Sequence, residues 1–429
     1  MFLRQADLAM NQFRLFFVIF SDGERVPVLT DQAGNPHWSA TLFSVTQIRN
    51  AGKAPNTTFA ALGAVRSLLA WADKRGVQLE ERFARREYLT EAEIESLANH
   101  ARSSFRSPEG GGKVVISLPR LRRVEGARAQ IEASDRGVSA GTQHARLSYI
   151  AKYLTWLATR FIEKTAKKVS DSSRAEIKEM ALALKLKRPK KGPRSRLSSR
   201  SGLSEVARER LLQIAEIGAE DNPFGSAVQH RNEVIVRILD ETGIRAGELL
   251  ALKVTDFDFQ KNEVVIARRH GDPDDPRVKQ PVAKTLDRRI PLSSELGKMA
   301  SNYVLTDRRS AFPARRHRFL FVVHKEGKHF GHPLSAKGLS KVLSTLKQRD
   351  PKRLAGLCCH IMRHTNNDRF SELMDTTNAT AAEEEQMRSY LMGWKEGSGT
   401  SATYTRRHIQ RKAREAFLKL QQRKRKDMT

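Results

Sequence analysis

The sequence predicts a multidomain protein, in which a small β-like N-terminal region precedes an all-α domain and a mixed α+β domain. Three observations support this fold class. Apolar residues recur at helical spacing between residues 55 and 165, a basic segment follows, and strand-like runs alternate with helical runs from residue 203 onward. The chain has 429 residues and an apolar content of 39%, which is enough for two or three domains with real cores.

The N-terminal region, residues 1–55, is β-like. FRLFFVIF, from Phe13 to Phe20, contains Arg14 and is too short to span a membrane. A Ser-Asp-Gly turn and a second apolar run follow it, which predicts two strands joined by a turn. The chain has only two cysteines, which are adjacent, and this excludes a disulfide framework. With no signal-peptide cleavage pattern after the apolar run, we expect a cytoplasmic, DNA-associated bacterial protein.

The next region, residues 56–165, reads as an all-α domain. TTFAALGAVRSLLAWADKRG predicts a helix that Gly76 ends, and Thr90 with Glu93 predicts a capping box at the start of another. PEGGGK, residues 108–113, predicts a flexible loop. TQHARLSYIAKYLTWLATRFI predicts a long helix. Its apolar stripe consists of Leu147, Ile150, Leu154, Leu157 and Phe161.

The net charge of +29 indicates a polyanionic partner, and nucleic acid is the usual one. A membrane-surface protein is disfavoured because we find no long basic amphipathic helix with a Trp/Phe/Leu face. The charge concentrates in KLKRPKKGPRSRLSSR, residues 185–200, which has eight basic residues and no acidic one. We predict that residues 166–202 form a basic interdomain linker that also crosses a nucleic-acid backbone. The alternative is a linker that is merely solvated.

Two polar elements occur early in the last region, residues 203–429. Arg245 follows the glycine that breaks an apolar helix, and Glu248 stands three residues later. By itself this pair is a common ion pair on a helix surface. Lys284 lies in QPVAKTLDRRIPL, which predicts a hairpin with the lysine near its tip. By itself such a lysine is an ordinary solvated charge.

Two further polar elements follow. In CCHIMRHT, His360 and Arg363 share one helix face. His360 and His364 could also bind zinc, but no second cluster of ligands completes a tetrahedral site, and the cysteines are expected to pack as small apolar residues. In YLMGWKEGSGTSATYTRRH a helix ends at Gly393-Trp394, and Tyr404 follows a glycine- and serine-rich loop. Tyr390 shares an apolar helix face with Met387 and Leu391, so we predict a core position for it.

The order of these elements resembles the catalytic domain of the tyrosine site-specific recombinases, the phage-integrase family. The quoted motifs are TGIRAGELLAL, KTLDRRIPL, HIMRHT and LMGW, and the resemblance covers roughly residues 203–415. Trp394 stands where most members of that family have His. The resemblance implies that residues 56–165 form a core-binding (SAM-like) DNA-binding domain. It also implies that residues 203–429 form the catalytic domain, with a C-terminal protomer-exchange helix.

The resemblance also implies a mechanism. Tyr404 is the expected nucleophile and forms a 3′-phosphotyrosine bond with DNA, while Lys284 protonates the leaving 5′ oxygen. Lys279 is the alternative acid. Arg245 and Arg363 clamp the phosphate, His360 assists proton transfer, Trp394 donates its indole N–H, and Glu248 orients Arg245 or its neighbours. The expected catalytic set is therefore Arg245, Lys284, His360, Arg363, Trp394 and Tyr404.

The implied partners are double-stranded DNA with a specific recombination site and further copies of the chain. We expect a dimer at each site and a tetramer in the synapse, with accessory recombination proteins as candidate partners. A C-terminal stripe should dock onto a neighbouring protomer or, alternatively, pack on its own domain. It consists of Ile409, Ala413, Ala416, Phe417 and Leu420.

The expected function is integration, excision or transposition of a mobile element without metal or cofactor. A Gly-rich phosphate loop and a carboxylate cluster for two metal ions are both absent from the sequence, which agrees with this. Two alternatives remain. One is a type IB topoisomerase-like enzyme, which relaxes supercoiled DNA and rejoins the same strand. The other is a catalytically silent DNA-binding accessory protein.

Overall fold

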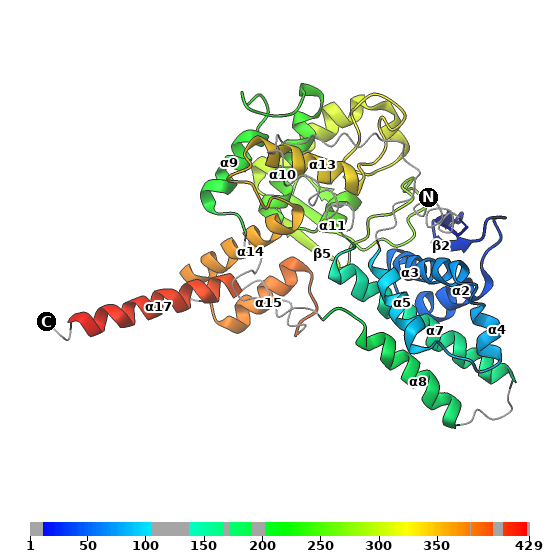
Figure 1. Ribbon diagram of the computed structural model, residues 1–429. Coiled ribbons are helices and arrows are strands. Elements are labelled where there is room, and N and C mark those ends of the chain that lie inside the picture. The colour runs from blue at the N-terminus through cyan, green and yellow to red at the C-terminus, as the bar shows by residue number, and fades with distance from the viewer. Residues whose placement is uncertain are drawn as a thin grey trace, which may run out of the picture. The chain divides into compact units, whose positions relative to one another are not determined.

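The computed structural model describes residues 12–103, 137–165, 171–190, 202–377, 379–397 and 406–426. The chain divides into two compact units. One comprises Met1–Phe20 and Arg25–Arg194, and the other comprises Ser21–Glu24 and Ser195–Thr429. Each unit has its own large hydrophobic core, so each is held together by its own apolar contacts. Figure 1 shows the helices and strands of the two units.

The first unit is mainly helical, with one two-stranded sheet. Its elements are β1 (Arg14–Ile19), β2 (Arg25–Thr30), α2 (Trp38–Ser44), the π-helical turn η1 (Val45–Arg49), α3 (Pro55–Lys74), α4 (Leu79–Ala84), α5 (Glu91–Arg102), α7 (Ala140–Thr165) and α8 (Asp171–Leu186).

The two N-terminal strands confirm the predicted small β region. β1 pairs antiparallel with β2, with Phe16 opposite Val28, and Gly23 takes φ of +84° in the turn between them. Leu29 of β2 is buried in the core that the helices form. The sequence did not indicate α2 and η1, which follow the strands within the same 55 residues.

The predicted helical patterns are confirmed in detail. Glu93 N–H donates to Thr90 Oγ1 over 3.3 Å, and Thr90 N–H donates to Glu93 Oε2 over 2.8 Å, which is the expected capping box. α3 ends at Lys74, just before Gly76 at φ of +65°. In α7 the stripe from Leu147 to Leu157 is fully buried. The predicted loop at residues 108–113 lies outside the described residues.

The structure differs from the prediction at the start of the linker. α8 lies within the range predicted as linker, yet its apolar stripe packs into the helical core. Ile177, Met180 and Leu184 form that stripe at helical spacing. The prediction overlooked this spacing because it rested on the charged residues of the segment. Lys187, just after α8, makes an ion pair with Glu95 of α5. Residues 191–201 of the predicted linker lie outside the described residues.

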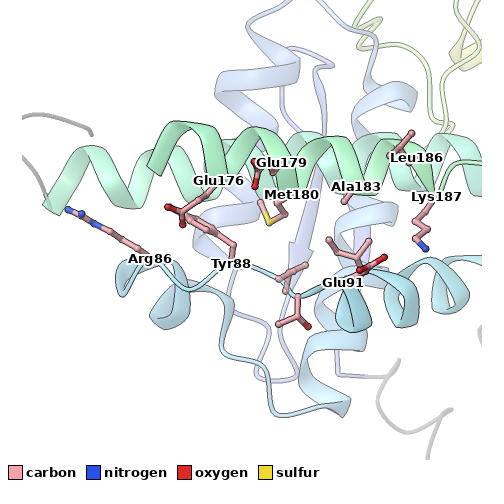
Figure 2. Close-up of a pocket in the computed structure, with 12 residues that line it drawn as sticks. Arg86, Tyr88, Glu91, Glu176, Glu179, Met180, Ala183, Leu186 and Lys187 are labelled. Carbon is pink, nitrogen blue, oxygen red and sulfur yellow. The ribbon is translucent and has the colours of Figure 1, made fainter. Parts of the chain in front are cut away.

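A pocket of about 670 Å³ opens on this unit beside α5 and α8 (Figure 2). Its apolar lining includes Met180 and Leu186. Glu91, Glu176 and Glu179 also line it. Arg86 and Lys187 line it as well, so the charge of the lining is mixed and gives no ground for a DNA contact in this pocket.

The second unit mixes helices with a three-stranded sheet. Its elements are α9 (Glu205–Ala215), α10 (Ser226–Thr242), α11 (Ala246–Ala251), the 3₁₀ turn η2 (Val254–Asp256), β3 (Phe257–Asp258), β4 (Glu263–Ile266), β5 (Arg288–Pro291), α12 (Ser294–Tyr303), the π-helical turn η3 (Val304–Arg308), the 3₁₀ turn η4 (Phe312–Arg316), α13 (Ala336–Arg349), α14 (Cys359–Thr376), α15 (Ala381–Met392) and α17 (Arg406–Lys426).

The sheet corrects the predicted position of Lys284. β5 pairs antiparallel with β4, with Ile290 opposite Val264, and β3 pairs on the other side of β4. The connection from β4 to β5 covers residues 267–287. Lys284 therefore lies in a long loop near the start of β5, and no tight hairpin places it at a tip.

The prediction for Tyr390 is wrong. Tyr390 is 60% exposed, and Met387 is exposed as well. The buried residues of α15 are Arg388, Ser389 and Met392. The apolar spacing predicted the wrong buried face of α15, because Arg388 occupies the inward position. Its charge is satisfied by polar groups of α14 and α15.

α17, the red helix in Figure 1, leaves its apolar stripe exposed. Ile409, Phe417 and Leu420 are all open to solvent, so for these residues packing on their own unit is wrong. The ion pair between Lys412 and Asp375 joins α17 to α14. None of the helices in the described part of the chain combines the length and apolar character needed to cross a bilayer.

Replacing Tyr390 with Ser should change the free energy of unfolding by less than about 0.5 kcal/mol, because its side chain is exposed. Leu239→Ala, in the core of the same unit, should cost about 2–5 kcal/mol because it leaves a cavity. Guanidinium unfolding of the full chain, followed by circular dichroism, measures both. A Tyr390→Ser loss as large as that of Leu239→Ala would contradict the exposed placement.

Candidate phosphate site

The site begins where α10 ends. Val234, Ile235, Ile238 and Leu239 bury one face of this helix, as the sequence predicted. Gly243 ends the helix at φ of +60°, and an added Cβ there would lie 2.7 Å from Asn366 Oδ1. The chain then turns sharply, so Arg245 becomes the N-cap of α11 with its side chain partly exposed. Glycine thus permits the turn that aims Arg245 out of the core.

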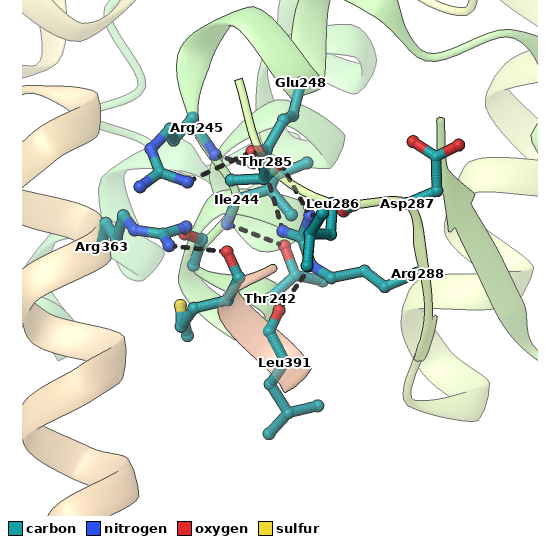
Figure 3. A network of polar contacts seen from close by, with 12 residues as sticks. Thr242, Ile244, Arg245, Glu248, Thr285, Leu286, Asp287, Arg288, Arg363 and Leu391 are labelled. Atoms are coloured by element: carbon teal, nitrogen blue, oxygen red, sulfur yellow. Dashed lines mark hydrogen bonds and ion pairs between the residues drawn. The ribbon is translucent and has the colours of Figure 1, made fainter. Parts of the chain in front are cut away.

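Glu248 is a buried hub between three segments (Figure 3). Its Oε2 accepts hydrogen bonds from Arg245 N–H over 3.1 Å and from Arg288 Nη2 over 2.9 Å. Its Oε1 accepts from Thr285 Oγ1 over 2.6 Å and lies 3.5 Å from Arg245 Nη1. One carboxylate therefore fixes the backbone of Arg245 and also contacts its guanidinium, which is the orienting role expected for Glu248.

The same contacts set the charge of Glu248. Burial alone would raise the pKa of this carboxyl, but the charge of Arg288 and the hydrogen bonds from Thr285, Arg288 and Arg245 outweigh burial and hold the pKa below its ordinary value. Glu248 is therefore ionised at neutral pH and balances the two arginines around it.

Lys284 is exposed between two buried neighbours, Ala283 and Thr285. Thr285 donates to Glu248, so the loop is fastened one residue after the lysine. On the other side of the lysine, the loop passes so close to α11 that a Cβ on Gly247 would lie 2.9 Å from Val282 O. Lys284 is thus held beside the Arg245 turn, whereas Lys279 is exposed farther back in the loop.

Arg288 is a site residue that the sequence motifs did not indicate. Its side chain is fully buried, and besides Glu248 it donates from Nε to Leu391 O over 2.6 Å and from Nη1 to Thr285 Oγ1 over 3.1 Å. The alternation of buried and exposed residues along β5 could have revealed it. Arg288 and Ile290 face the same, buried side of β5, while Arg289 between them is exposed.

α14 carries Arg363 into the same place. The residue is 1% exposed, and its guanidinium donates to Gly243 O over 2.8 Å and to Met392 O over 3.0 Å. These carbonyls stand at the C-terminal ends of α10 and α15, where partial negative charge favours a cation. Because Gly243 lies two residues before Arg245, this contact brings the two predicted phosphate arginines to one turn (Figure 3).

The start of α14 holds the two histidines. His360 is exposed on the first turn, and its Nε2 lies 3.1 Å from His364 Nε2, so one ring donates and the other accepts. Among the described residues no group of three metal-binding side chains is present. Cys359 packs against the core as predicted, and burial raises the pKa of its thiol to about 12. Cys358 is exposed, which contradicts the prediction that both cysteines pack.

α15 ends in the predicted Gly-Trp turn. Gly393 takes φ of +63°, Gly393 N–H donates to Tyr390 O over 3.0 Å, and Trp394 N–H donates to Ser389 O over 2.8 Å, which is a Schellman motif. Trp394 is buried, and the Arg363 guanidinium lies 5.3 Å from the centre of its ring. The turn therefore places an indole directly against the buried arginine.

The structure thus connects Arg245, Arg363 and Trp394, through Glu248, the Gly243 carbonyl and the stacking of Arg363 on the indole, with His360 one turn of α14 away from Arg363. Lys284 precedes Thr285, which donates to Glu248. Tyr404 lies outside the described residues. The segment that carries it begins beyond Gly397 and ends before α17.

Several solved structures resemble the chain. One is the XerH site-specific recombinase bound to palindromic difH substrate, with 15% identity, coverage of 88% of this chain and 92% of that chain, and a TM-score of 0.42. Another is a lambda integrase dimer bound to a COC′ core site, with 12% identity, coverage of 86% and 77%, and a TM-score of 0.43.

Two sequence comparisons add to these. Transposase A from transposon Tn554 of Staphylococcus aureus is 26% identical over 137 residues, which are 32% of this chain and 35% of that protein. The match thus spans about a third of the relative's length. Residues 203–411, which hold the whole network above, match the phage integrase family. This stretch, 209 of the 429 residues, is therefore similar to the phage integrase family, the family of the tyrosine site-specific recombinases.

Proposed function

We propose that the protein cuts and rejoins DNA strands at a specific site through a 3′-phosphotyrosine bond to Tyr404, and that it serves the integration, excision or transposition of a mobile element. The observation that carries the proposal is the junction of Arg245 and Arg363. One guanidinium is aimed by Glu248, and the other is anchored on the turn that precedes Arg245. Two fixed guanidiniums at one turn are suited to hold a phosphodiester.

In the proposed cleavage step the phenol oxygen of Tyr404 attacks the phosphorus and forms the new P–O bond. The bond to the 5′ oxygen breaks, and Lys284 gives that oxygen its proton. His360 takes the proton of the phenol. Arg245 and Arg363 meet the charge that grows on the non-bridging oxygens, and the Trp394 indole N–H is a further donor to them.

In the proposed joining step a 5′ hydroxyl of a second DNA attacks the phosphotyrosine, and the free phenol is regenerated. The energy of the broken bond is kept in the ester, so the balance needs no metal or nucleotide. α17 supports assembly of copies on DNA, because its exposed residues Ile409, Phe417 and Leu420 form an apolar stripe suited to a neighbouring protomer. A dimer at each site and a tetramer in the synapse complete the proposal.

Tyr404→Phe should abolish the covalent complex and leave DNA affinity nearly unchanged, because it removes one hydroxyl. The substrates are nicked duplexes that tile the DNA flanking the gene. The adduct is resolved on a denaturing gel, and its peptide is mapped by mass spectrometry. Tyr390→Phe is the matched control, because Tyr390 is the exposed tyrosine nearest in sequence. An adduct that persists in Tyr404→Phe, or that maps to Tyr390, would overturn the assignment.

Lys284→Ala should slow cleavage strongly on ordinary DNA, because the leaving oxygen then lacks its acid. A 5′-bridging phosphorothiolate should restore the rate, since a thiolate leaves without a proton. Lys279→Ala is the control and should cleave both substrates at wild-type rates. Selective rescue of Lys279→Ala would transfer the acid role to that residue.

DNA binding should weaken steeply with salt, by roughly 0.9 in log affinity per log salt for each phosphate contact. Replacing Lys190, Lys191 and Arg194 with Ala should flatten this slope if the basic segment meets phosphates. Lys187→Ala should leave the slope unchanged, because Lys187 is paired with Glu95. Fluorescence anisotropy of a labelled duplex at several salt concentrations measures the slope, and equal slopes for all variants would make the segment merely solvated.

A further inference from the structure

A second arginine on α15, Arg388, is buried with no exposed surface and lies outside the proposed catalytic set. Its Nη1 donates to both the backbone carbonyl and Oδ1 of Asn367 on α14, each over 3.0 Å. Its Nη2 donates to Ser371 Oγ over 2.7 Å and makes an ion pair with Glu384. The guanidinium also stacks on the Phe370 ring, 4.8 Å from its centre. Arg388 therefore joins α15 to three residues of α14.

Asn367 passes this contact on to Arg363. Its side chain is fully buried, its Oδ1 accepts from Arg388, and its Nδ2 donates to Arg363 O over 2.8 Å. The same Nδ2 lies 3.3 Å from Met392 Sδ. Met392 in turn supplies the carbonyl that accepts from Arg363 Nη2. Asn367 thus touches both partners of one Arg363 anchor, and Arg388 fixes the amide of Asn367.

We propose that Arg388 is a positioning residue, which sets the register of α15 on α14 and thereby keeps the Met392 carbonyl on the Arg363 guanidinium. The inference rests on the proposed function only for its effect on cleavage. Its first consequence is structural. Without Arg388, α15 shifts along α14, one anchor of Arg363 is lost, and the Gly393-Trp394 turn moves away from the arginine.

The alternative is that Arg388 serves stability alone. A buried ion pair is a poor source of stability, because desolvation offsets much of the attraction, and its replacement by neutral side chains of similar size is often harmless. The hydrogen bonds to Asn367 are different, because no apolar side chain can replace them. The two roles can therefore be separated by removing the ion pair as a unit.

The test variant is Arg388→Met combined with Glu384→Gln in the full chain. Its melting temperature should fall less than that of Arg388→Met alone, because no unpaired charge remains. Single-turnover cleavage at saturating DNA should fall about 100-fold, a loss typical of a misplaced catalytic group, while DNA affinity stays unchanged. Arg388→Met alone should lose both stability and cleavage, because it leaves Glu384 without its partner.

Arg231→Met is the matched control. Arg231 is also a buried arginine of this unit, and its guanidinium donates to Val322 O and Asn232 Oδ1, away from Arg363 and Met392. This variant removes the same buried group without touching the contact between α14 and α15. Its cleavage rate, measured on folded protein, should equal that of the wild type.

A second measurement does not depend on cleavage. The chain has four tryptophans, which can be replaced with 5-fluorotryptophan, and Trp394→Phe assigns the fluorine signal of Trp394. That signal should shift in the Arg388→Met/Glu384→Gln variant and stay in place in Arg231→Met, because the Arg363 guanidinium lies over the Trp394 ring. A signal that stays in place in the double variant would overturn the inference, whatever the cleavage rate.

The two measurements separate the inference from the proposed function. If wild-type protein forms no adduct with any flanking DNA, the proposed function fails, and the fluorine shift still decides whether Arg388 sets the register. If the fluorine signal shifts but cleavage keeps its wild-type rate, the positioning role in the reaction is wrong. A shift together with the fall in rate supports the whole inference.

Discussion

The end of α15 is the constraint on which the site depends. A helix end leaves carbonyls without partners, and here three successive ones are capped from other segments. Leu391 O accepts from Arg288, Met392 O from Arg363, and Gly393 O from Leu286 N–H over 3.0 Å. A Cβ on Gly393 would lie 2.7 Å from Arg288 Nη1, so glycine is required both for the turn and for this approach. The capping joins β5, α14 and α15 at one point.

This arrangement also answers an electrostatic problem. Arg245, Arg288 and Arg363 repel one another, and together they would destabilise the unit if nothing balanced them. Glu248 balances the first two with one ionised carboxylate, and the C-terminal carbonyls of α10 and α15 offset the charge of the third. Because Arg363 is held by carbonyl dipoles, the site keeps its net positive charge. A second buried carboxylate would have cancelled part of that charge. The proposed phosphate therefore meets guanidiniums that are already oriented.

The sequence predicted the elements that follow a simple period. The apolar stripes of α7 and α10, the capping box at Thr90 and the glycine breaks at Gly243 and Gly393 all have local causes, and all are confirmed. One kind of error arose where a polar residue occupies a core position. Arg388 on α15 and Arg288 on β5 are buried because of distant partners, and no local pattern reveals those partners. Tyr390 was misplaced for the same reason, since the inward face of its helix is polar.

The long loop from β4 to β5 carries two lysines, and their positions in the structure distinguish them where the sequence could not. A lysine in a strand-like run is uninformative alone, and two lysines of this loop are exposed. Only Lys284 stands next to a residue that is bonded to the Glu248 hub. A shift of the loop would therefore have to break the contact between Thr285 and Glu248, and that same carboxylate orients Arg245. One carboxylate thus bonds both the residue beside the proposed acid and the backbone of the proposed phosphate clamp, which links the position of the loop to that of Arg245.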